Sequence, residues 1–229
     1  MADTPRVDAM LFLASSVHDM KNSISVMIGV IKKFLAQTTP EEAENYQEMA
    51  NMLYETERIN GNLIQLLTLY KFSNDIYPFS MEQVDLDEFA DAAASHVAPL
   101  LNSKNITLEI DIEEGSQGEF DVDLITGVVV HAMNNAAHYT KDTIRLVVHM
   151  VDDAMEIRVE DNGRGFPPQM IEEGIAAMRG INFSTGSTGL GLYFSAAVAK
   201  MHHSKAETGS IRLENGGALG GGCFVMRLP

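Results

Sequence analysis

The amino-acid sequence predicts an α+β protein with two domains, a pair of long antiparallel helices followed by a domain that mixes helices and strands. The first seventy residues carry apolar side chains at heptad spacing, which is typical of long packed helices. Later segments alternate with period two, as half-buried strands do, between apolar helical stretches. The run 73–80 contains Asn74, Asp75 and Pro78 and breaks the helical pattern. We therefore predict a helical hairpin over residues 8–72 and a mixed domain over 82–229.

Composition excludes several classes of protein. The 229 residues are 45% hydrophobic and contain no apolar run long enough for a membrane span. A single cysteine, Cys223, leaves no internal disulfide framework and suits a reducing cytoplasm. The net charge of −16 argues against a nucleic-acid-binding surface, which needs clustered Lys and Arg. We expect a cytoplasmic protein with no membrane span and no nucleic-acid partner.

The hairpin follows from two seams. The first runs from Met10 to Leu35 in steps of three and four residues, and Lys21 is its one position that is not apolar. Thr39 and Pro40 are typical of a helix start, and a second seam continues to Tyr70. One hairpin cannot bury two such seams, so we predict a homodimer in which two hairpins form a four-helix bundle.

His18 flanks the first seam and is the chemical oddity of the hairpin. Asp19 follows it, and Lys21 and Asn22 lie three and four residues on along the same helical face. A neighbouring carboxylate can hold an imidazole in one tautomer and make it a better nucleophile. The pattern fits equally a solvated surface histidine beside a helix charge pair.

The second domain alternates its elements in order. A helix should start after Asp85 as its cap and run to about Ser103. The remaining predicted elements are a strand over 106–112, a helix over 123–140, a strand hairpin over 143–151 and 154–160, an apolar helix ending at His202, and strands over 209–214 and 223–228. His202 at a helix end should interact with the helix dipole.

Three positions in this domain could bind a ligand. Asp161, followed by Gly163 and Gly165, could hold the amino group of a base while the backbone passes close by, although the same residues could form a plain turn. The run Gly189-Leu190-Gly191 opens a helix and offers free amides to phosphate, or else lets the helix pack closely. Asn135 is unfavourable inside an apolar helix unless its amide is used, although Asn is also common at helix ends.

The segment 12–24, with His18, Asp19, Lys21 and Asn22, resembles the phospho-acceptor box of sensor histidine kinases of two-component systems. The resemblance implies that His18 accepts the γ-phosphoryl group of ATP and that Asp19 acts as its base. Asn22 would position a water that dephosphorylates the partner. Ser23 replaces the usual proline of this box.

Residues 134–140 are similar to the N box of the same kinases, 161–165 to their G1 box and 187–194 to their G2 box. The resemblance implies a GHKL-type ATP-binding catalytic domain, an α/β sandwich, with ATP and Mg²⁺ as cofactors. The implied ligands are Asn135 for magnesium, His138 and Tyr139 beside the nucleotide, Asp161 for the adenine amino group, Gly163 and Gly165 at the base pocket, and Gly189, Leu190 and Gly191 at the phosphates. His131 and His138 replace an asparagine and a basic residue of the family pattern.

The segment 167–187 shows no firm strand and would form a lid over the nucleotide. Kinases of this type often carry an F box here, and the sequence offers only Phe183, out of the expected context.

The resemblance covers residues 8–229 and implies a kinase that autophosphorylates His18 from ATP and passes the phosphoryl group to an aspartate of a response-regulator receiver domain. Two alternatives stay open. One is a histidine phosphotransferase or phosphatase with a degenerate ATP domain, and the other is a non-enzymatic dimeric regulator that docks on another kinase. The input signal would come from a separate sensor protein, from the hairpin, or from a region outside this sequence.

Overall fold

The computed structural model describes residues 9–38, 45–173 and 189–229, which divide into two compact units, Met1–Tyr77 and Pro78–Pro229. Each unit is described by itself below. No helix within the described ranges combines the length and the apolarity needed to cross a membrane.

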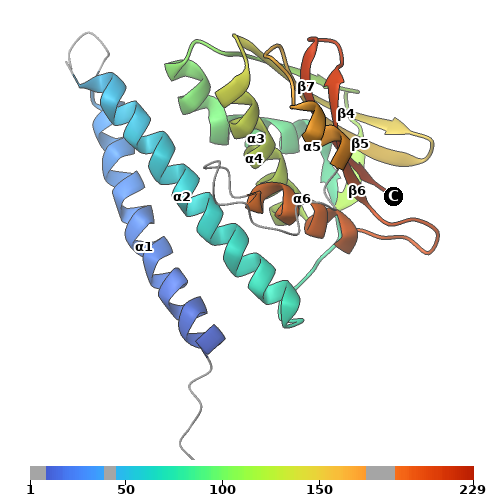
Figure 1. Ribbon diagram of the computed structural model, residues 1–229, viewed down its shortest axis with the longest axis horizontal. Helices are drawn as coiled ribbons and strands as arrows, with labels where there is room; N and C mark the ends of the chain where they lie inside the picture. Colours follow the sequence, from blue (N-terminus) through green and yellow to red (C-terminus); the bar gives the residue numbers. More distant parts are fainter. Residues whose placement is uncertain (1–8, 39–44, 174–188) are drawn as a thin grey trace, which may run out of the picture. The chain divides into compact units, whose positions relative to one another are not determined.

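The first unit is a hairpin of two helices, α1 (Ala9–Ala36) and α2 (Tyr46–Ser73), each 28 residues long (Figure 1). Seam residues Val17, Ile31 and Leu53 are buried between them, and an ion pair of 2.7 Å joins Lys32 Nζ to Glu57 Oε1. The expected helix start at Thr39 and Pro40 lies in 39–44, outside the described residues. The described part of the second helix begins at Tyr46.

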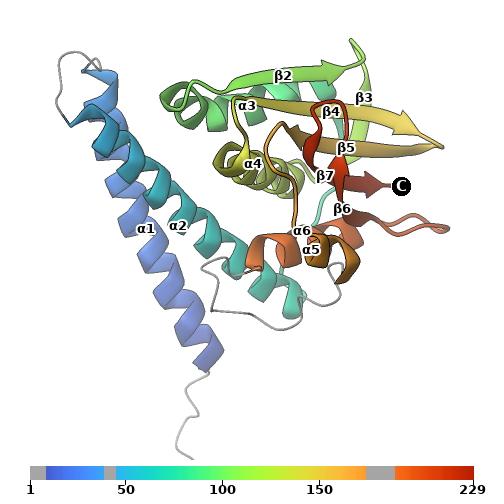
Figure 2. The same ribbon diagram turned by 45° about the horizontal axis from the view of Figure 1, so that its top comes forward.

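The second unit is built on a five-stranded sheet (Figure 2). The strands lie in the order β2 (Thr107–Ile112), β4 (Thr143–Val151), β5 (Ala154–Asp161), β7 (Gly221–Leu228) and β6 (Ser210–Gly216). Strands β2 and β4 are parallel, and the other pairs are antiparallel. A separate two-stranded sheet joins β1 (Glu82–Asp85) to β3 (Gln117–Phe120). The strand hairpin predicted over 143–160 is confirmed, whereas β1 and β3 were not predicted.

Helices α3 (Leu86–Ser103), α4 (Val122–Tyr139) and α6 (Leu190–Met201) cover one face of this sheet (Figure 2). Asp85 caps α3 as predicted, because its side chain accepts from the backbone N–H groups of Asp87 and Glu88 at 3.0 Å. The core between helices and sheet is fully apolar at positions such as Ile125, Met133, Ile144 and Ile157. A short helix, α5 (Pro168–Glu173), follows the loop after β5.

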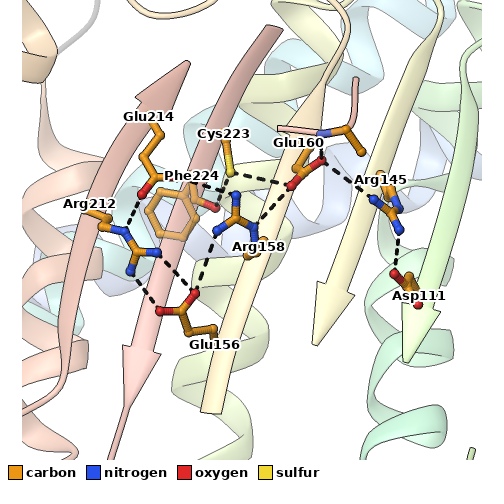
Figure 3. A network of polar contacts seen from close by, with 10 residues as sticks. Asp111, Arg145, Glu156, Arg158, Glu160, Arg212, Glu214, Cys223 and Phe224 are labelled. Atoms are coloured by element: carbon orange, nitrogen blue, oxygen red, sulfur yellow. Dashed lines mark hydrogen bonds and ion pairs between the residues drawn. The ribbon is translucent and has the colours of Figure 1, made fainter. Parts of the chain in front are cut away.

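The side chains of Figure 3 form an ion-pair network along the sheet. It joins four arginines to four carboxylates, namely Arg145, Arg158, Arg212 and Arg227 to Asp111, Glu156, Glu160 and Glu214. The two hydrogen bonds from Arg212 to Glu156, at 3.0 and 3.1 Å, hold the pKa of that carboxyl below its usual range. Burial raises the pKa of the nearby Cys223 thiol to about 12, so this thiol stays protonated and unreactive.

Glu160 is the most enclosed carboxylate of the network, with 3% of its surface exposed. It accepts from Arg158 Nε at 3.1 Å and from the backbone N–H of Ala218 at 3.0 Å. Glu160→Ala would leave both donors without this partner, so we expect the free energy of unfolding to fall by about 3 kcal/mol. Urea unfolding measures this change. Glu160→Gln, which keeps an acceptor for Ala218, should cost less, and equal losses for the two variants would contradict the argument.

His202 lies at the end of α6 as a buried neutral ring, 1% exposed. Its Nδ1–H donates to the carbonyl of Val198 at 2.8 Å, and its Nε2 accepts from the backbone N–H of Asp121 at 3.0 Å. The ring therefore does contact the last turn of its helix, but as a neutral link to the start of α4, because burial lowers its pKa.

The buried ring predicts a pH dependence of stability. Because the pKa of His202 is lowered below its ordinary value of 6.5, the unfolded chain takes up a proton before the folded chain does. Its contribution to stability is complete above pH 6.5 and is lost as the pH falls from 6.5 towards the folded pKa. We expect this loss to be at most about 1.4 kcal/mol per pH unit. Unfolding curves of the wild type and of His202→Gln between pH 5 and 8 should show a shallower slope for the variant, and parallel curves would contradict this role.

Candidate functional site

The sequence motifs of the second unit meet at the last turns of α4. Asp161 ends β5, Tyr139 ends α4, and Gly189 lies directly before α6. A Cβ atom at Gly163 would lie 2.0 Å from the carbonyl oxygen of Tyr139, so the loop after β5 rests on the helix with no room for a side chain. The N box and the G1 box are thus in direct contact.

Asp161 presents a carboxylate in a glycine-lined cradle. Its side chain is 6% exposed, and its Oδ1 accepts from the backbone N–H of Gly163 at 2.7 Å. Gly221 of β7 passes so close that a Cβ there would lie 2.4 Å from the Asp161 carbonyl oxygen. Among the described residues, no side chain or amide donates to Asp161 Oδ2. This oxygen can therefore accept a hydrogen bond from an amino group of a ligand.

Asn162 holds the same loop from the other side, a role that the sequence analysis missed. Its Oδ1 accepts from Thr140 Oγ1 at 2.7 Å and from the backbone N–H groups of the next three residues, and its Nδ2 donates to Asp142 Oδ1 at 2.7 Å. Hydrogen bonds from Thr143 and Asn162 lower the pKa of the Asp142 carboxyl. The connection from α4 to β4 is thereby fixed to the G1 box.

His131 and Asn135 lie one turn apart on α4, with Asn135 Nδ2 3.0 Å from His131 Nε2. Burial lowers the pKa of His131 to about 4, so the ring is neutral and its Nε2 accepts this hydrogen bond. The bond leaves the amide oxygen of Asn135, which is solvent-exposed, for another partner. Gly191 packs on the same ring, since a Cβ there would lie 1.8 Å from Nε2, and this contact ties the G2 box to the N box.

The Asn135 amide suits a magnesium ion. Mg²⁺ prefers oxygen ligands and keeps several waters when phosphates supply its other ligands. Within the described ranges no group of three or more His, Cys, Asp or Glu side chains could hold a metal ion, so an all-protein cage is absent there. A single amide oxygen therefore fits a metal that arrives with a nucleotide.

Aromatic and basic groups flank the last turn of α4. The rings of His138 and Tyr139 meet edge to face at 4.9 Å between centroids, and the guanidinium carbon of Arg164 lies 5.4 Å from the Tyr139 ring centre. His138, Tyr139 and Arg164 are all exposed. They form a polar and aromatic rim next to the Asp161 cradle.

In α6 the first helical residue is Leu190, and Gly189 before it adopts φ 62°. The predicted placement of the G2 glycines at a helix N-terminus is therefore what the structure has. Most of the predicted lid over 167–187, including Phe183, falls in 174–188, outside the described residues.

The hairpin carries the second group of candidate residues on one exposed face of α1. His18 Nδ1 lies 3.7 Å from Asp19 Oδ1 and 3.4 Å from Asn22 Nδ2, and the His18 side chain is 60% exposed. Helix α1 continues through Ser23, whose Oγ donates to the Asp19 carbonyl oxygen at 3.1 Å. The three side chains are close enough to act together.

Comparison with known proteins gives matches along the chain. Residues 120–229 match the family described as histidine kinase-, DNA gyrase B-, and HSP90-like ATPase. The sensor protein kinase WalK of Staphylococcus aureus is 24% identical over 209 residues, which are 87% of this chain and 50% of that protein. For WalK of the JH9 strain the same match covers 34% of the protein. The chain therefore spans half or less of the length of these curated relatives.

Solved structures share the fold. The histidine kinase AdeS of Acinetobacter baumannii has a TM-score of 0.58 at 17% identity, over 92% of this chain and 96% of that one. Full-length ShkA in complex with AMPPNP has a TM-score of 0.63 at 18% identity, over 95% of this chain and 45% of that one. The catalytic domain of the histidine kinase ThkA has a TM-score of 0.55 at 21% identity and covers 66% of this chain.

The fold and the converging boxes define an ATP-binding domain of the GHKL type, joined in sequence to an antiparallel helical hairpin. These likenesses confirm the resemblance drawn from the sequence and place the chain among the sensor histidine kinases.

Proposed function

We propose that this chain is an ATP-dependent histidine kinase that phosphorylates itself on His18 and passes the phosphoryl group to an aspartate of a response-regulator receiver domain. The observation that carries the proposal is an exposed histidine with a carboxylate at 3.7 Å, in the same chain as an ATPase domain. The solved relative ShkA was crystallised with AMPPNP, which supports nucleotide binding by this fold. We further propose a cytoplasmic location.

In the hairpin, Asp19 lies beside Nδ1 of His18 and favours the tautomer with its proton on that nitrogen. Nε2 then holds the lone pair that attacks the γ-phosphorus, so an N–P bond forms while the bond to the ADP oxygen breaks. Asp19 accepts the Nδ1 proton as the ring becomes positive. Asn22 at 3.4 Å from Nδ1 would position a water for dephosphorylation of the partner.

In the ATP-binding domain, Asp161 Oδ2 would accept from the adenine amino group, with Gly163 and Gly165 at the edge of the base. Asn135 would bind magnesium through its amide oxygen, and His138 and Tyr139 would flank the nucleotide. The free amides around Gly189, Leu190 and Gly191 would face the phosphates. Bound Mg²⁺ supplies charge neutralisation at the phosphates.

Exposed apolar side chains on α1 and α2 support a homodimer. Val26, Met27, Val30 and Ile59 are 48–68% exposed in the single chain. A four-helix bundle made from two hairpins would bury such side chains. Sedimentation at tens of micromolar should show a dimer, and a monomer at that concentration would contradict this part of the proposal.

The first experiment is incubation with γ-labelled ATP and magnesium, followed by acid and alkali treatment of the protein. Phosphohistidine is labile in acid and stable in alkali, so label with that behaviour supports the proposal. If label is absent, a nucleotide-binding assay decides what remains. Binding without label would indicate a kinase that needs an activator, and neither binding nor label would contradict the kinase.

The alternative is a histidine phosphotransferase or phosphatase with a weakened ATP domain. It is favoured by His131 and His138, since a neutral imidazole is a weaker phosphate partner than Lys or Arg. A non-enzymatic regulator docking on another kinase would instead tolerate loss of His18 in a complementation test.

A further inference from the structure

The loop of the G1 box is held by a side chain from a distant strand. Asn215 of β6 lies 49 residues away in sequence from Phe166. Its Oδ1 accepts from the backbone N–H of Phe166 at 2.7 Å, and its Nδ2 donates to the Phe166 carbonyl oxygen at 2.9 Å. The amide therefore grips both polar backbone groups of one loop residue, as a neighbouring strand would.

This contact depends on residues that lack side chains. Asn215 pairs in register with Gly222 at the start of β7, the strand that separates β6 from β5. A Cβ at Gly222 would lie 3.1 Å from the Phe166 ring and 2.8 Å from Asp161 Oδ2. Glycine at this position lets the loop lie on β7, where Asn215 can reach it.

Gly165 completes the arrangement. It adopts φ +77°, and a Cβ there would lie 2.6 Å from Asn215 Oδ1. Glycine is thus required both by the backbone angle and by the close approach of the amide. The positive φ turns the chain so that both backbone groups of Phe166 face Asn215.

The clamp borders the nucleotide site. The Phe166 ring and Asp161 Oδ2 both lie against Gly222, and this oxygen is the one that the Gly163 amide leaves available. We propose that Asn215 is a positioning residue of the nucleotide site, which acts through Phe166 to hold the G1 loop beside the base-binding carboxylate. The proposal rests on the function proposed above. It gives a role to a side chain that the sequence assigned to an ordinary glycine-rich turn.

The test combines a binding measurement with a local probe of the clamp, on the full chain. Titration calorimetry with ADP and no magnesium isolates the base side of the site from the metal. We expect Asn215→Ala to weaken ADP binding about tenfold, because the loop is then no longer preorganised. Amide hydrogen exchange should show Phe166 protected in the wild type and unprotected in Asn215→Ala.

A second variant and a matched control sharpen the result. Asn215→Asp keeps the acceptor for the Phe166 N–H but places an oxygen against its carbonyl oxygen, so Phe166 should stay protected while ADP still binds more weakly. Asn102→Ala, which removes an exposed asparagine from α3, should change neither quantity. The midpoint of thermal unfolding of all three variants should stay close to that of the wild type.

Each other outcome overturns the proposal. Unchanged ADP affinity in Asn215→Ala, with Phe166 unprotected, would show that the clamp does not matter for binding. Unchanged protection of Phe166 would show that the clamp does not exist. A wild-type protein that binds no ADP would overturn the nucleotide site itself, and this failure is distinct because it appears before any substitution.

Discussion

A His18→Gln variant is expected to incorporate no acid-labile phosphate from γ-labelled ATP, while it binds ATP as the wild-type protein does. Gln has no ring nitrogen with a basic lone pair, so the N–P bond cannot form. The substitution should leave the fold intact, because His18 is 60% exposed and its two polar neighbours lie on the same helix.

His96→Gln is the matched control, since it makes the same change at an exposed histidine of α3. It should be labelled at the wild-type rate. Asp19→Asn should slow labelling by about 10²- to 10⁴-fold, the usual contribution of a general base. Label that persists in His18→Gln would mean that another residue accepts the phosphoryl group.

Asp161→Asn is expected to weaken ATP binding about 100-fold. The Asn oxygen would take the place of Oδ1 and accept from the Gly163 N–H, so the Asn amino group would face the base. Two donors would then meet where a carboxylate accepted a hydrogen bond. Loss of a charge-assisted bond together with an unpaired donor accounts for this size of effect.

The same geometry predicts a change of base preference. An amino group in place of Asp161 Oδ2 can donate to the carbonyl at position 6 of guanine, so the ratio of ATP to GTP affinity should fall in Asp161→Asn. Titration calorimetry with both nucleotides measures it. Asp91→Asn, the same charge change at an exposed site of α3, should leave both affinities unchanged. An Asp161→Asn protein that binds ATP normally would remove Asp161 from the site.

Periodicity was enough to predict the long elements. The seams of the hairpin, the Asp85 cap and the strand pair that delivers Asp161 all depend on residues close in sequence. Strands β1 and β3 were missed because four residues are too few to show an alternating pattern. Their pairing depends on contacts between segments that lie far apart in the chain.

The site was predicted where a motif holds both the residue and its partner. Asp161 and Gly163 are such a pair, two residues apart. The contacts of Asn162 with the α4–β4 connection and of Asn215 with Phe166 were missed, because each spans about twenty to fifty residues and exists only once the sheet register is set. The His131–Asn135 bond lies within one turn of helix, and its direction became clear only when burial showed the ring to be neutral.

The ion-pair network of Figure 3 also affects how fast a nucleotide can reach the site. Its four arginines are matched by four carboxylates, so they add nothing to offset the net charge of −16. An approaching nucleotide is itself an anion and meets a repulsive field, which salt screens over about 8 Å at physiological ionic strength. The association rate of ATP should therefore rise with added salt, opposite to the behaviour of a site that attracts its ligand electrostatically.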